Sequence, residues 1–78
     1  MLILDYKAFH LNEDVFNMQI RKFLKRVSIT SQREIEQAVR AAIAAGSLPA
    51  DWHVQVQMQL TISGLDVVVQ IDDTLDLE

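Results

Sequence analysis

The sequence predicts a small α+β fold, in which a two-helix αα-hairpin packs on one face of a small antiparallel β-sheet in the order (β)ααββ. Two observations support this prediction. Hydrophobic residues between positions 12 and 46 recur at intervals of three or four, the spacing of amphipathic helices. From residue 54 onward they alternate with polar residues, as in half-buried strands. We expect one domain spanning residues 1–78, with the αα-hairpin at 12–46 and a β-hairpin at 53–78.

Residues 1–11 alternate loosely between apolar and charged side chains, with Asp5 and Lys7 on the polar side. This pattern favours a short N-terminal strand, and a terminal extension is the alternative. Asn12 is a good N-cap for the first helix, because its side-chain oxygen can accept a hydrogen bond from the first turn. The apolar stripe of this helix comprises Phe16, Ile20, Phe23, Leu24 and Val27.

The segment 28–30 interrupts the helical pattern, so we expect the first helix to end there. Ser31 and Glu34 then match a capping box, which predicts a second helix. Gly46 is its expected left-handed stop, and Pro49 prevents the helix from resuming. The inward residues of this second helix are Ile35, Ala38, Val39, Ala42 and Ile43.

The β-hairpin is predicted from a two-residue turn, Ser63-Gly64, between two alternating segments. In that register every apolar residue lies on one face, with Ile62 facing Leu65, Leu60 facing Val67, Met58 facing Val69, and Val56 facing Ile71. Asp73 would then lie on the apolar face opposite Val54, which suggests a bulge or the end of the pairing.

The segments NEDVFNMQIRKFLKRV and TSQREIEQAV resemble a family of small, uncharacterised bacterial proteins known only as a domain of unknown function. The resemblance is close over residues 12–46 and looser to the C-terminus. Members begin with a methionine directly before the Asn-Glu-Asp triplet, so residues 1–11 depart from the pattern. Membership implies a bacterial, cytoplasmic protein, and it implies no activity and no catalytic residues.

Composition limits the function classes further. Half of the residues are hydrophobic and none is cysteine, so neither disulfides nor thiolate zinc sites can stabilise this short chain. Burial of the surplus apolar surface against a second copy would stabilise the chain, so we expect a homodimer. No segment is typical of a signal peptide or a membrane span, so we expect a cytoplasmic protein with no membrane partner.

Catalytic and metal-binding patterns are weak. His10 and His53 match no catalytic or metal-binding spacing, and the serines read as cap or turn residues. The tail acids Asp72, Asp76 and Glu78 share one strand face, with Asp66 further back, yet they lack the rhythm of a calcium loop. We therefore predict that the protein is not an enzyme and has no cofactor, no metal and no catalytic residue.

The candidate partner-binding residues lie on one helix face and comprise Met18, Arg21, Lys22, Lys25 and Arg26. A row of cations attracts phosphates, so nucleic-acid binding is the alternative function. Against it, the chain has a net charge of −4, with seven Lys and Arg and five acids in residues 1–48, and six acids and no base in residues 49–78. We expect this face to bind an acidic surface instead, on a second copy or on an acidic protein partner.

The strand at 54–63 carries no charge, although exposed edge strands usually do. Its glutamines, Gln55, Gln57 and Gln59, predict either an interior strand or pairing across a subunit interface. Trp52 is interpreted as closing the apolar layer. The sequence thus favours a non-catalytic protein–protein interaction or self-associating module of unknown biochemical activity.

Overall fold

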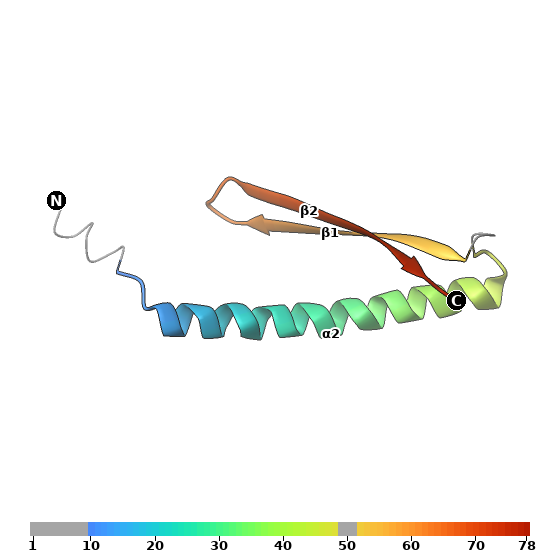
Figure 1. The fold of residues 1–78 in the computed structure, drawn as a ribbon, viewed down its shortest axis with the longest axis horizontal. Helices are drawn as coiled ribbons and strands as arrows, with labels where there is room; N and C mark the ends of the chain where they lie inside the picture. The colour runs from blue at the N-terminus through green and yellow to red at the C-terminus, as the bar shows by residue number, and fades with distance from the viewer. Residues whose placement is uncertain (1–9, 49–51) are drawn as a thin grey trace. The chain divides into compact units, whose positions relative to one another are not determined.

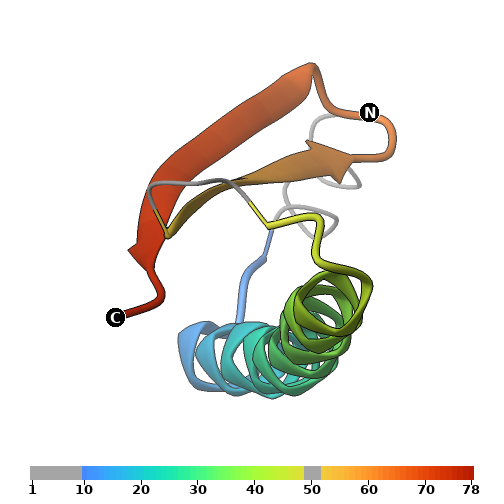
Figure 2. The same ribbon diagram turned by 90° about the vertical axis from the view of Figure 1, so that its right-hand side faces the viewer.

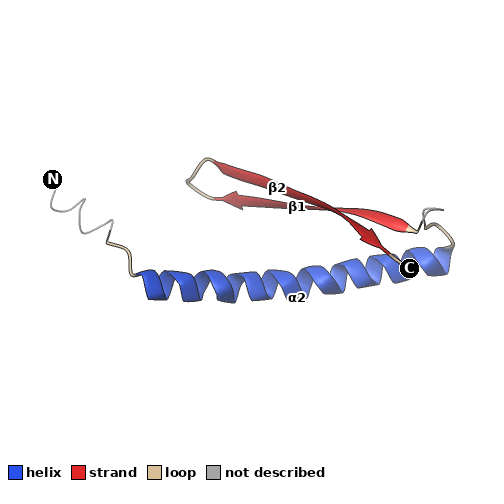
Figure 3. Cartoon of the chain, in the orientation of Figure 1, coloured by secondary structure: helices blue, strands red, loops and turns tan. Residues whose placement is uncertain are grey.

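The computed structural model describes residues 10–48 and 52–78, and it contains one helix followed by one β-hairpin (Figures 1 and 3). The elements are helix α2 (Glu13–Ala45), strand β1 (His53–Ile62) and strand β2 (Val67–Asp76). The chain divides into two compact units, Met1–Ala38 and Val39–Glu78. The strand predicted near the N-terminus lies outside the described residues.

Helix α2 begins where the sequence predicts. The backbone N–H of Val15 donates to the Oδ1 atom of Asn12 at 3.1 Å, the geometry of an N-cap side chain. Glu13 and Asp14 occupy the first turn, where negative charge is favoured by the helix dipole. The predicted start at Asn12 is therefore confirmed.

The predicted αα-hairpin is wrong, because α2 runs without a break through residues 28–31. Ser31 and Glu34 therefore lie inside a helix of 33 residues and do not cap a second one. The segment Ser-Ile-Thr-Ser contains neither glycine nor proline, and each of its residues costs only about 0.5 kcal/mol relative to alanine in a helix. That cost is smaller than the cost of ending one helix and nucleating another.

A Schellman motif ends α2 at the predicted residue. Gly46 has a φ of 68°, its N–H donates to the Ile43 carbonyl at 3.1 Å, and the Ser47 N–H donates to the Ala42 carbonyl at 2.9 Å. These two bonds satisfy carbonyls that a helix end otherwise leaves without partners.

The two strands form a two-stranded antiparallel sheet, whose twist is visible in Figure 2. Ile62 pairs with Val67, and the ladder continues without a gap to His53 and Asp76. The predicted register is therefore wrong by two residues. Asp73 lies opposite Val56, not Val54, and the expected bulge is replaced by continued pairing. A shift of two preserves side-chain parity, so all the predicted strand faces remain as expected.

The turn geometry explains this shift. The N–H of Leu65 donates to the Ile62 carbonyl at 3.2 Å, and Gly64 has a φ of 80°. Positive φ at the third residue alone defines a type II turn, whereas tight two-residue hairpins use types I′ and II′, which need positive φ at the second. Ser63 does not adopt positive φ. Pairing therefore resumes only at Val67, beyond a four-residue loop.

We expect Gly64→Ala to destabilise the protein by about 1–2 kcal/mol, the cost of a left-handed conformation for a residue with a Cβ. A Cβ at this position would meet nothing within 4 Å, so the cost comes from the backbone alone. Gly64→Asn should cost less, because asparagine tolerates this region. Urea unfolding would measure both, and an alanine effect below about 0.3 kcal/mol would contradict the assigned turn.

No side chain among residues 10–48 and 52–78 is buried, so the described part of the chain has no core. Helix α2 and the hairpin each carry an apolar face. These faces are the main feature of the candidate site.

Candidate self-association surface

The hairpin is amphipathic across its two strands. One face carries Val54, Val56, Met58, Leu60 and Ile62 from β1 with Val67, Val69, Ile71 and Leu75 from β2. Met58, Leu60 and Ile62 are each about 40% exposed, and Ile71 is 59% exposed. Asp73 is the one acid on this face, and its carboxylate accepts a hydrogen bond from the Thr74 backbone N–H at 2.8 Å. Nine apolar side chains thus form a continuous surface.

The opposite hairpin face is polar apart from Val68, and it is internally hydrogen-bonded. His53 and Asp76 lie 2.7 Å apart between Nδ1 and Oδ1, and Gln57 donates to the Asp72 carboxylate at 3.2 Å. The Thr74 hydroxyl donates to the Gln55 side chain at 3.1 Å. These pairs link directly opposed residues of the ladder, so Gln55 and Gln57 stabilise the hairpin through cross-strand contacts.

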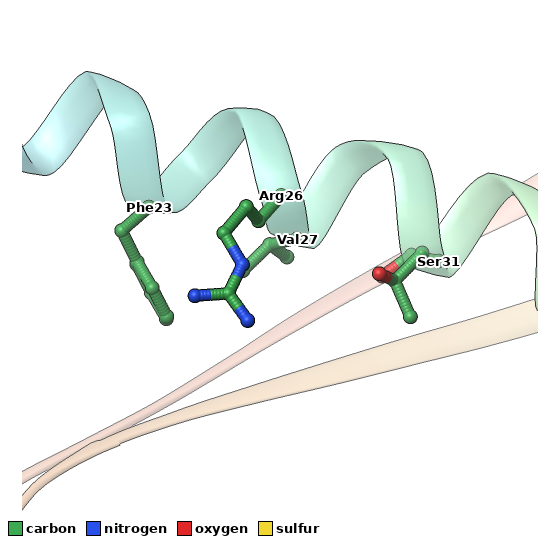
Figure 4. A pocket seen from close by; sticks show the side chains of 5 residues that line it. Phe23, Arg26, Val27 and Ser31 are labelled. Atoms are coloured by element: carbon green, nitrogen blue, oxygen red, sulfur yellow. The ribbon is translucent and has the colours of Figure 1, made fainter.

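On the helix, one stripe of positions, all apolar except Ser31, runs along the whole of α2. Leu24 and Val39, which were predicted to lie on the apolar faces, lie at its edge. The stripe residues are Phe16, Ile20, Phe23, Val27, Ser31, Ile35, Ala38 and Ala42, separated by three or four positions. Figure 4 shows Phe23, Val27 and Ser31 projecting from the same side of the helix. Phe16 and Phe23 are 46% and 54% exposed, which is unusual for two aromatic side chains of the same stripe.

Sequence reasoning placed Ser31 at a helix end and therefore missed its place within the stripe. At about 3.6 residues per turn, Ser28 and Ile29 lie off the stripe, and only Ser31 interrupts it with a polar side chain. Ile43, predicted to face inward, lies on the other side of the continuous helix and is 52% exposed. The stripe spacing of three or four residues continues across residues 28–31, and this continuity was the signal that could have revealed the arrangement.

The five predicted partner-binding residues all lie on α2 and are exposed. Met18, Arg21, Lys22 and Lys25 occupy the side opposite the stripe, and Met18 is 58% exposed. Arg26 lies at the border, where with Phe23, Val27, Thr30 and Ser31 it lines a shallow, open hollow of about 300 Å³ (Figure 4). All four cations lie on the one continuous helix, and we call Arg21, Lys22, Lys25 and Arg26 the basic face.

The acidic residues of the C-terminal tail are not part of a metal-binding cluster within the described residues. Asp72 and Asp76 lie on one strand face, where Asp72 accepts from Gln57 and Gln70. No group of three or more histidine or acidic side chains among residues 10–48 and 52–78 could hold a metal ion. A search of the same residues for a membrane-spanning helix found none.

Trp52 adopts a φ of 59°, which is rare for a bulky side chain, and its carbonyl accepts from the Leu77 N–H at 3.0 Å. This bond ties the start of β1 to the residues after β2. Trp52 is 44% exposed, so the prediction that it closes an apolar layer has no counterpart within the described single chain.

No curated protein and no solved structure matches this chain. A family model covering residues 11–78 does match, and the family is described as one of unknown function, DUF6494. The predicted resemblance to an uncharacterised domain family is thereby confirmed. With this match spanning its helix and its hairpin, the chain belongs to the DUF6494 family of unknown function.

Proposed function

We propose that this protein is a non-catalytic interaction module that folds and acts as a homodimer. The supporting observation is the exposure of large hydrophobic side chains on both elements while no described side chain is buried. Soluble monomers rarely expose continuous apolar surfaces of this extent, and such surfaces typically mark protein–protein interfaces.

Energetic considerations support the same proposal. A two-stranded hairpin is marginal in water on its own, and a helix gains most of its stability from packing its apolar stripe. Burial of apolar surface contributes about 2.5 kcal/mol per 100 Å². A second copy supplies that burial for both elements, and so offsets the conformational entropy lost on folding.

The polar groups support a binding role over a catalytic one. His53 and Asp76, whose Nδ1 and Oδ1 atoms lie 2.7 Å apart, are 48% and 72% exposed on the hairpin. Catalysis requires a nucleophile, a base and an orienting group that converge in a pocket from which water can be excluded. The hollow beside Arg26 is instead shallow and open, and three of its five lining residues, Phe23, Val27 and Ser31, belong to the stripe.

Sedimentation equilibrium tests this proposal. We expect a mass of twice 8.9 kDa at about 10 µM, because interfaces of homodimers typically persist at micromolar concentration. A folded monomer of 8.9 kDa at about 1 mM would overturn the proposal.

The basic face leads to a separate prediction about nucleic acids. We expect no binding of DNA or RNA oligomers tighter than about 10 µM near physiological salt, because the acid-rich hairpin half repels the same polyanion. Fluorescence anisotropy with labelled oligomers measures this affinity. Submicromolar, salt-sensitive binding that is lost in the Arg21→Glu/Lys25→Glu variant would replace self-association with nucleic-acid binding as the function of this face.

A further inference from the structure

The stripe of α2 is symmetric along the helix. Its successive intervals are four, three, four, four, four, three and four residues, a series that is the same from either end. Residues that are equidistant from Ile29 form four pairs, namely Phe16 with Ala42, Ile20 with Ala38, Phe23 with Ile35, and Val27 with Ser31. A two-fold axis beside Ile29 would therefore place stripe residues of two antiparallel copies at matching heights.

Side-chain size distinguishes antiparallel from parallel pairing. The first half of the stripe carries two phenylalanines, whereas the second half carries Ala38 and Ala42. An antiparallel pair places Phe16 level with Ala42 and Ile20 level with Ala38, so large residues meet small ones at a constant interhelical distance. A parallel pair in register would place phenylalanine against phenylalanine and alanine against alanine, which leaves gaps near Gly46.

Charge favours the same orientation. Arg26 directly precedes Val27 and lies at the border of the stripe. Antiparallel pairing brings Arg26 close to the height of Glu34 of the second copy, which lies on the same side of the stripe. Opposite charges then meet at the border of the interface, twice by symmetry.

The length of α2 indicates that a second copy is needed to cover the whole stripe. A helix of 33 residues is about 50 Å long, and a strand of 10 residues spans about 34 Å. Even a hairpin laid flat along the helix of its own chain would leave about a third of it uncovered.

We infer that two copies of α2 pair antiparallel through this stripe, with the two-fold axis beside Ile29 and Ser31 next to Val27 of the second copy. The inference rests on the proposed self-association and adds its surface and its orientation. Ser31 is then the polar position near the axis, where it disfavours shifted registers because these would place its hydroxyl against larger apolar side chains.

Cysteine cross-linking tests the orientation, because the chain has no cysteine of its own. Ile20→Cys/Ala38→Cys should form a covalent dimer on mild oxidation, since these two positions are at the same height in the antiparallel pair. Each single variant should remain uncross-linked, because identical positions would lie about 27 Å apart, far beyond the span of a disulfide. Covalent dimers from Ile20→Cys alone would show parallel pairing and overturn the inference.

A second measurement avoids substitution within the stripe. A spin label on Gln19→Cys, an exposed position beside the stripe, should give a distance of at least about 30 Å between copies. A distance below about 20 Å would indicate parallel helices and overturn the inference. A dimer by sedimentation that fails both expectations leaves the proposed function intact and refutes this geometry, whereas a monomer refutes both.

Discussion

Replacing Thr30 with proline is expected to destabilise the protein by at least about 3 kcal/mol, enough to unfold it in the absence of other stabilisation. Thr30 lies in the middle of α2, where proline removes a backbone hydrogen bond and its ring clashes with the preceding turn. Circular dichroism should show the loss of most of the helical signal. Under the two-helix interpretation the same residue would precede a helix start, where proline is tolerated.

Thr30→Ala is the matched control. Alanine has the highest helix propensity, so this variant should be as stable as the natural sequence or slightly more so. A Thr30→Pro variant that retains its helical signal and unfolds at an unchanged urea concentration would show that the chain breaks between the two halves of α2.

Replacing Phe23 with glutamate should weaken dimer formation by about 100- to 1,000-fold. Phe23 is 54% exposed in the single chain, so the charge is tolerated there. On association it would be buried level with Ile35 of the second copy, without a partner for its charge, at a total cost of about 3–4 kcal/mol per dimer. Sedimentation equilibrium over a range of concentrations would measure the change in dissociation constant.

Met18→Glu provides the comparison on the other side of the helix. Met18 is 58% exposed and lies among the cations of the basic face, so a glutamate there should leave the dissociation constant within about twofold. Equal weakening by both substitutions would mean that the stripe is not the contacting surface.

The ends of α2 could be predicted from the sequence because side-chain chemistry specifies them locally. Asn12 accepts a hydrogen bond from the first turn, and Gly46 supplies the left-handed conformation at the last one. The faces of the hairpin were also predictable, since alternation fixes them independently of the turn.

Two features were predicted wrongly, because local sequence signals competed with continued backbone hydrogen bonding. Ser31 and Glu34 match a capping box, yet the same residues cost little inside a helix, and the uninterrupted helical ladder is favoured. Similarly, Ser63-Gly64 forms a turn, but of a type whose twist does not suit a two-residue hairpin, and the register moved by two. The stripe could not be predicted as one continuous surface, because it is continuous only in an unbroken helix.

The central claim is that folding of this chain is coupled to its association with a second copy. The most direct test is thermal unfolding followed by circular dichroism at protein concentrations from about 1 to 300 µM. If the proposed dimer alone buries the apolar faces, the midpoint should rise steadily with concentration, by roughly 10 °C or more over this range. A cooperative transition with the same midpoint at every concentration would contradict the account, because it would mean that a single chain folds alone.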